Sequence, residues 1–190
     1  MFDFVRFAPP KIELGFKGFV ILSEKPIEGL HGVIVRASNA KELRKKLKNV
    51  GDSIVAVECA DWKEAVMRKK VDILLDSENR NLDYATIKLA KEKDVAIEFG
   101  LSKFIKAKGL KRSALFSKLK EEIRVVNKFD TPFIITSSAE NVYQLRTKKQ
   151  IENFFSFFGL SAKKADFFAE RIVRRYYDER YVMDGFFIEK

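Results

Sequence analysis

The chain has 190 residues and is 46% hydrophobic, so it can bury a substantial core in one domain and is not a disordered chain. Its formal net charge of +10 favours an anionic partner, and no apolar run approaches the about 18 residues of a membrane-spanning helix. The single cysteine, Cys59, cannot form an internal disulfide, and the first residues show no signal-peptide pattern, so we expect a cytoplasmic protein with no membrane association.

The first part of the chain combines short strand patterns with one basic helix. Residues 2–7 alternate apolar and polar side chains and predict a strand, and residues 18–22 and 32–36 predict two more. Ser38 is expected to cap the helix that follows. Basic residues share one face of that helix: Lys41, Arg44, Lys45 and Lys48. Such a face is usually only solvated, and contact with phosphates is the alternative.

Strand and helix patterns then alternate to the end of the chain. Strands are predicted at 53–58, 71–75, 95–100 and 132–136, with an eighth at 186–188, and helices at 61–69, from Asp83, at 113–129, after a Thr147–Gln150 capping box, and from Ser161 to 177. The alternation predicts a parallel α/β sheet. Seven or eight strands favour a single trimmed TIM-like (β/α) barrel over residues 1–190, because a regular barrel takes about 250 residues.

A cation-rich segment joins the predicted strand at 95–100 to the helix at 113–129. Seven Lys or Arg and no acid lie between Leu101 and Lys120, and we expect a loop there. The candidate RNA contacts are Lys103, Lys106, Lys108, Lys111 and Arg112. A solvated loop is the alternative, but like charges repel one another unless a polyanion compensates, so RNA binding is favoured. The last two of these residues lie where a helix begins and where free backbone N–H groups also bind phosphate.

Four further residues are candidate RNA contacts. Ser137 and Ser138 leave the strand at 132–136 at the end of the barrel where ligands bind, and hydroxyls there can donate to phosphate oxygens. Arg146 can act as a forked phosphate clamp. The alternatives are that the serines cap a turn and that Arg146 pairs with Glu140 or another acid. Arg80, in the turn after the strand at 71–75, has a weaker case.

Catalytic and metal-binding signatures are sparse. His31 is the one histidine, and there is no Walker or Gly-x-Gly-x-x-Gly loop. Four acids lie on or beside strands and could offer oxygen ligands to Mg²⁺: Asp3, Glu58, Asp72 and Glu98. Pairing with Lys or Arg is the commoner role of such acids. The sequence therefore predicts no catalytic residue and no metal site.

One ordered set of motifs resembles a known family. A strand ends in Ala96-Ile97-Glu98, the basic segment follows, and a second strand leads into Ser137-Ser138-Ala139-Glu140. Leu145-Arg146 comes next, and then a helix that ends in Phe158-Gly159-Leu160-Ser161. Over roughly residues 71–175 this order resembles the archaeal ribonuclease P protein component 3 family, which is homologous to a subunit of the eukaryotic enzyme.

The resemblance carries expectations of its own. It implies a barrel related to the polymerase-and-histidinol-phosphatase (PHP) metalloenzymes, without their histidines. It implies a subunit of ribonuclease P, whose RNA removes the 5′ leader from precursor tRNA and brings the Mg²⁺, so that the chain binds no cofactor itself. The implied partners are ribonuclease P RNA, precursor tRNA through the holoenzyme, and a small ferredoxin-like protein subunit. Two alternatives stay open: a metal-dependent PHP-type phosphoesterase, and a general RNA-binding barrel.

Overall fold

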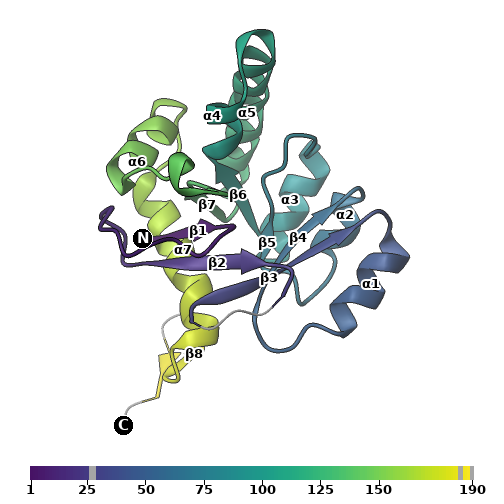
Figure 1. The fold of residues 1–190 in the computed structure, drawn as a ribbon. Helices are drawn as coiled ribbons and strands as arrows, with labels where there is room; N and C mark the ends of the chain where they lie inside the picture. Colours follow the sequence, from purple (N-terminus) through teal and green to yellow (C-terminus); the bar gives the residue numbers. More distant parts are fainter. Residues whose placement is uncertain (26–28, 184–185, 189–190) are drawn as a thin grey trace.

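The computed structural model describes residues 1–25, 29–183 and 186–188, and its centre is one parallel sheet. Neighbouring strands in this sheet are also neighbours in the chain. The strands are β1 (Phe2–Val5), β2 (Gly18–Ser23), β3 (His31–Ala37), β4 (Ile54–Cys59), β5 (Ile73–Leu74), β6 (Ala96–Gly100) and β7 (Phe133–Thr136). The sheet curls into a nearly closed barrel with helices around it (Figure 1), which confirms the predicted trimmed TIM-like fold.

The seam between β1 and β7 is closed by a few bonds and not by a strand ladder. The Arg6 amide donates to the Ala139 carbonyl at 2.8 Å. The Ser137 amide donates to Asp3 Oδ1 at 2.7 Å. Both bonds join the first strand of the sheet to the segment that follows the last strand. The buried carboxylate of Asp3 therefore helps to close the barrel.

The helices are α1 (Ala40–Lys48), α2 (Trp62–Val66), α3 (Tyr84–Glu92), α4 (Ser102–Lys106), α5 (Gly109–Phe129), α6 (Lys148–Phe157) and α7 (Ala162–Tyr177), with a 3₁₀ turn, η1 (Val142–Gln144). The predicted caps Asp83, Thr147 and Ser161 each accept a bond from the first turn, and Thr147 and Gln150 form the full capping box. At α1 the cap is Asn39 and not Ser38, whose hydroxyl donates to Glu42 instead.

Alternation along the strands separates two apolar layers. Phe4, Leu22, Ile54 and their neighbours fill the barrel interior, and the buried side of α7 covers the interior at one end. The other face of each strand packs against the remaining helices. On β6, Ala96 faces inward and Ile97 outward, so Glu98 is again an inward position. A carboxylate therefore lies inside the barrel.

Two predicted elements differ from the structure. The cation-rich segment is not a loop, because α4 and the first turn of α5 occupy it and α5 begins at Gly109. The predicted eighth strand is not part of the barrel. β9 (Phe186–Phe187) pairs in antiparallel fashion with β8 (Tyr181–Met183) in a separate two-stranded sheet, and residues 184–185 lie outside the described residues.

Candidate nucleic-acid interface

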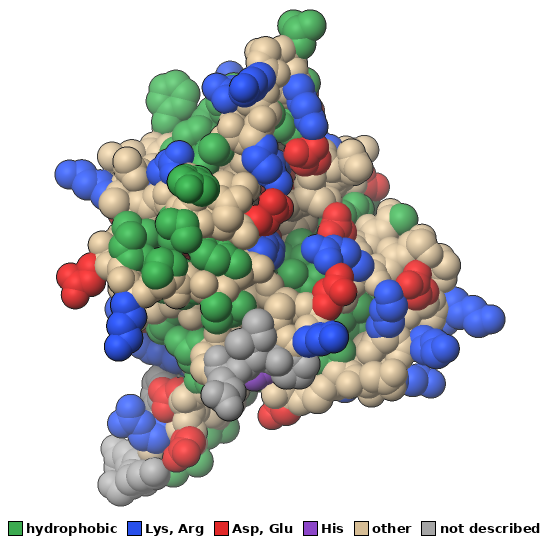
Figure 2. Space-filling view, in the orientation of Figure 1, with side chains coloured by type: hydrophobic (Ala, Val, Ile, Leu, Met, Phe, Trp, Pro, Cys, Tyr) green, Lys and Arg blue, Asp and Glu red, His purple; other side chains and the backbone are tan. Residues whose placement is uncertain are grey.

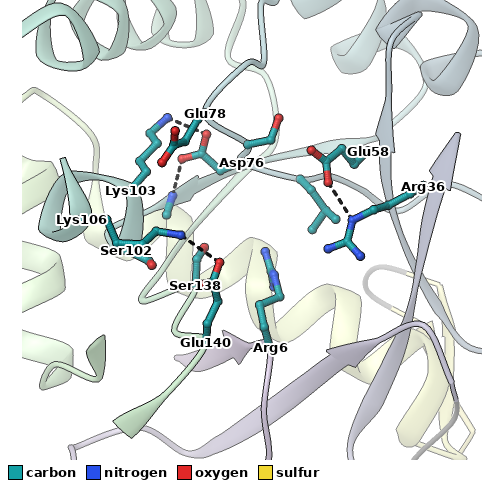
Figure 3. Close-up of a pocket in the computed structure, with 13 residues that line it drawn as sticks. Arg6, Arg36, Glu58, Asp76, Glu78, Ser102, Lys103, Lys106, Ser138 and Glu140 are labelled. Atoms are coloured by element: carbon teal, nitrogen blue, oxygen red, sulfur yellow. Dashed lines mark hydrogen bonds and ion pairs between the residues drawn. The ribbon is translucent and has the colours of Figure 1, made fainter. Parts of the chain in front are cut away.

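The carboxyl ends of the strands surround a cleft of about 330 Å³ at the mouth of the barrel (Figure 3). This is the end where barrels of this type bind ligands. Arg6 enters the cleft from the end of β1, and Arg36 and Glu58 enter from β3 and β4. Asp76 follows β5, and Lys103 and Lys106 lie on α4. Ser138 and Glu140, which follow β7, complete the wall.

Carboxylates neutralise most of the cations at the mouth. Lys106 Nζ lies 2.9 Å from Glu140 Oε1, and Arg36 Nε lies 3.0 Å from Glu58 Oε2. Lys111, at the start of α5, lies 2.5 Å from Glu78. These acids come from segments distant in sequence, so the run of cations without acids is not a field of unpaired charge in three dimensions.

The five predicted cations of the segment have three different surroundings. Lys103 is buried, and its Nζ lies 2.6 Å from Asp76 Oδ1, so its charge is used in an internal ion pair. Arg112 is half-buried and donates to the Ala107 carbonyl at 2.6 Å. Lys106 and Lys111 are exposed and paired. Lys108 is exposed and has no ion pair within the described part of the chain.

The two serines bind buried carboxylates. Ser137 donates to Asp3 through both its amide and its hydroxyl, the latter at 2.6 Å from Oδ2. Ser138 Oγ lies 2.9 Å from Glu98 Oε1. Ser138 has a φ of +48°, and a Cβ at Gly100 would lie 2.1 Å from its Oγ. Glycine at position 100 therefore lets the hydroxyl reach Glu98, and both serine hydroxyls bind buried carboxylates.

Two acids in or beside the barrel have different electrostatic surroundings. Burial raises the pKa of Asp3 to about 7, although the hydrogen bonds from Ser137 oppose the shift. The nearby Glu98 charge acts in the same direction as burial. Glu98 itself accepts from Arg6 Nη2 at 2.5 Å and from the Asp76 amide at 2.9 Å. Glu98 is therefore stabilised by a cation, Arg6, whereas Asp3 is held by the backbone amide and the hydroxyl of Ser137.

Asp72 and Glu58 complete the set of candidate metal-ligating acids. Burial raises the pKa of Asp72, which accepts from the Val55 amide at 2.9 Å and from the Tyr176 hydroxyl at 2.8 Å. Glu58 pairs with Arg36. In the described ranges no group of three or more His, Cys, Asp or Glu side chains could hold a metal ion. His31 contacts the Tyr177 hydroxyl at 3.3 Å.

Arg80 is a brace inside the protein and cannot reach RNA on this surface. Its side chain is 1% exposed. It donates to the Glu98 carbonyl at 2.5 Å and to Glu122 Oε2 at 2.8 Å, and it lies 3.3 Å from Asp76 Oδ1. These bonds tie the loop after β5 to β6 and α5. No local pattern in the sequence indicated this internal pairing, because Glu98 and Glu122 are distant from Arg80 along the chain.

Arg146 binds backbone carbonyls and not Glu140. Its Nη1 donates to the Tyr143 carbonyl at 2.8 Å and to the Leu145 carbonyl at 2.6 Å. The side chain is half-buried, so the guanidinium closes the turn before α6. The sequence did not reveal Arg6 and Arg36 as mouth residues, because no local pattern shows that the ends of β1 and β3 meet the basic segment.

Comparison with known proteins settles the family. The model of the family described as RNase P subunit p30 matches residues 12–175. The chain belongs to this ribonuclease P subunit family. It is 54% identical to ribonuclease P protein component 3 of Archaeoglobus fulgidus over 100% of this chain and 96% of that protein. The component 3 protein of Methanococcoides burtonii is 26% identical, over 90% of this chain and 82% of the relative.

A solved structure supports the fold. A chain in the cryo-EM structure of archaeal ribonuclease P with mature tRNA matches with a TM-score of 0.81 and 24% identity, covering 100% of this chain and 97% of that one. Together with the family model, the curated relatives confirm the predicted resemblance, and the chain is a protein subunit of ribonuclease P. No helix in the described residues is long and apolar enough to cross a membrane.

Proposed function

We propose that the chain is one RNA-binding barrel domain, over residues 1–190, that binds ribonuclease P RNA and supports removal of the 5′ leader from precursor tRNA. The observation that carries the proposal is a basic surface formed where α4 meets α5. We call it the α4–α5 tip and define it as Lys106, Lys108, Lys111 and Arg112. Figure 2 shows Lys and Arg side chains gathered over this end of α5.

The start of α5 adds to the attraction for phosphate. The first turn of this helix holds no acid, and no side chain caps it. The first N–H groups of a helix lack partners within the helix and carry partial positive charge, which favours a bound anion. Buried side chains further along the helix hold α5 against the rest of the protein: Leu115, Leu119, Ile123 and Val126. The tip therefore combines side-chain cations with backbone donors.

RNA binding of this kind depends on the backbone and shape of the RNA. Cations that neutralise phosphates release counterions, so the affinity falls steeply as salt rises. Folded RNA is recognised chiefly by its shape, its phosphates and its 2′-hydroxyls, and base readout is not required. The physical role of the tip is to reduce repulsion between phosphates in the folded RNA, which stabilises its active form.

In this proposal the RNA carries the chemistry and brings the Mg²⁺, and the isolated chain is not a catalyst. The state of the mouth acids supports this division of labour. Arg6 and the Asp76 amide engage Glu98, and Lys103 engages Asp76, so these carboxylates already have protein donors. A metal-activated hydroxide would need such acids to be available as ligands.

The remaining partners in the proposal follow from the family. They are precursor tRNA, reached through the holoenzyme, and a small ferredoxin-like protein subunit. The solved archaeal ribonuclease P that resembles this chain was determined with mature tRNA, which supports the tRNA partner. Cytoplasmic location belongs to the proposal as well, and the single cysteine, which is buried and free, is consistent with a reducing compartment.

The test is charge reversal of the tip in a reconstituted holoenzyme. The variant K106E/K108E/K111E/R112E should bind ribonuclease P RNA more weakly at low salt and lower the cleavage of precursor tRNA. The thermal midpoint should stay nearly unchanged. The ion pairs of Lys106 and Lys111 are exposed and contribute little to stability, and acids at the start of α5 are favoured by the helix dipole, which offsets the bond that Arg112 loses.

A matched control uses four lysines near the opposite end of the barrel, in K88E/K91E/K93E/K128E. Lys88 and Lys91 have exposed acidic partners, and Lys93 and Lys128 have none among the described residues, which matches the tip. RNA affinity unaltered by the tip variant, or lowered equally by the control, would contradict the proposal. Cleavage by RNA alone, with no gain from the wild-type chain and its partner subunit, would favour a general RNA-binding barrel instead.

A further inference from the structure

A stripe of lysines on α1 is not neutralised by the protein. Lys41, Lys45 and Lys48 lie at i, i+4 and i+7, so they share one line along the helix. All three are exposed, and none forms an ion pair with any residue that the structure describes. We call this set the α1 stripe.

Two other cations of the same helix, Arg44 and Lys46, do form ion pairs. Lys46 Nζ lies 2.8 Å from Glu42 Oε1, and Arg44 Nε lies 3.0 Å from Glu64 Oε1. Arg68, after α2, shares the same Glu64 carboxylate. The protein therefore compensates Arg44 and Lys46 and leaves the three lysines of the stripe uncompensated.

The stripe is not required for folding. Leu43 and Leu47 hold α1 against the barrel, and Asn39 caps it. Lys41 and Lys45 repel each other slightly, whereas Lys45 and Lys48 lie in the last turn, where the helix dipole favours cations. These two effects oppose each other, so the stripe adds little to the stability of α1.

The position of the stripe relates it to the mouth. α1 follows β3, whose Arg36 lines the cleft, so the stripe begins near the rim and runs away from it over about 10 Å, at about 1.5 Å per residue. Figure 2 shows basic side chains over α1 and over the upper end of α5, with acidic side chains between them. Glu58, Glu78 and Glu140 line the cleft that separates the two basic surfaces.

We propose that the α1 stripe is a second phosphate-contacting surface for the same RNA, so that the RNA spans the mouth and rests on both rims. This rests on the proposed function. The acids of the cleft are paired with Arg36, Lys106 and Lys111, so the cleft itself has little net attraction for phosphates. The exposed lysines of the two surfaces attract phosphates, so the RNA backbone stays above the cleft and does not enter it. The two contacts act as separate sites on one RNA, which raises the affinity of the whole surface.

The experiment measures how RNA affinity depends on salt, using the chain assembled with ribonuclease P RNA and the partner subunit. For K41Q/K45Q/K48Q we expect at least a tenfold weaker affinity at low salt and a slope of log K against log salt that is smaller by about two to three, about one for each phosphate-contacting lysine. The thermal midpoint should change little. Combined with the tip variant, the losses should add, since the two surfaces share no partners.

The control is K88Q/K93Q/K128Q, which removes three exposed lysines near the opposite end of the barrel. Its slope should match the wild type. If the wild-type chain binds RNA but the stripe variant keeps the affinity and slope of the control, the inference fails and the proposed function stands. If the wild-type chain shows no salt-dependent binding at all, the proposed function itself fails.

Discussion

Single residues at the barrel mouth show how burial decides the use of a charge. Lys103 and Lys108 are five positions apart in one basic segment, yet the first is buried against Asp76 and the second is exposed. Asp3 is the opposite case, a buried acid that forms no ion pair with any residue that the structure describes. Its two oxygens accept from Ser137 at the seam of the barrel, and burial holds its pKa well above that of an exposed aspartate.

Asp3 should make stability fall as pH rises. In the unfolded chain its pKa is near 3.8, whereas in the folded chain it is about 7, so between these values the folded state binds more protons than the unfolded state. The contribution is therefore most favourable below about pH 4 and is lost as pH rises through 7, by an amount on the order of a few kcal/mol.

Asp3→Asn removes this titration and keeps an acceptor for the Ser137 amide. We expect the variant to gain stability relative to wild type as pH rises from 4.5 to 7.5, measured by urea denaturation at each pH. Asp83→Asn is the control, because hydrogen bonds from Thr86 lower the pKa of Asp83 and its effect is already complete above about pH 5. A stability difference between wild type and Asp3→Asn that does not change with pH would contradict the assignment.

At the scale of an element, α6 shows how a local signal positions a packed surface. The capping box fixes where α6 begins, and the period of the helix then directs Phe154 and Phe158 toward Phe116 of α5. The ring centroids of Phe116 and Phe158 lie 5.6 Å apart in a stacked pair. This contact supports α5 along its length and thereby holds the α4–α5 tip in place.

Thr147→Ala should lower stability by about 1 kcal/mol, because it removes the hydroxyl that accepts from the Gln150 amide. The thermal midpoint should fall by about 2–4 °C for a chain of this size. Thr147→Ser keeps the oxygen and should stay close to wild type. An equal loss in both variants would show that the methyl group, and not the cap, is responsible.

At the scale of the whole molecule, the barrel gathers charges from distant segments and cancels most of them at its mouth. Glu58, Glu78 and Glu140 come from three different strand ends and meet Arg36, Lys111 and Lys106 there. The net charge of +10 is consequently carried by side chains outside the mouth. The molecule thus presents two basic rims, the α4–α5 tip and the α1 stripe.

Because the acids at the mouth are already paired, we expect no metal-dependent hydrolysis by the isolated chain. When Mn²⁺ or Zn²⁺ is added to the isolated chain with a chromogenic phosphodiester, we expect hydrolysis no faster than with the metal alone. Turnover that saturates with metal and disappears in Glu98→Gln would favour the PHP-type phosphoesterase instead. Glu98 is the informative position, since it is the acid that lies inside the barrel beside Arg6.

The sequence by itself determined the strands, the start of α6 and the family of this protein. Apolar runs gave the strands, the Thr147–Gln150 box gave the start of α6, and the ordered motifs gave the family, because each of these signals lies within a short stretch of chain. Only the tertiary structure decided which charges are free. Arg80, Lys103 and the two serines meet partners from other strands, and no local pattern records such a meeting. For the same reason, the sequence did not show that Lys106 and Lys111 in the basic segment have acidic partners. Nor did it show that the lysines of the α1 stripe are exposed and unpaired among the described residues.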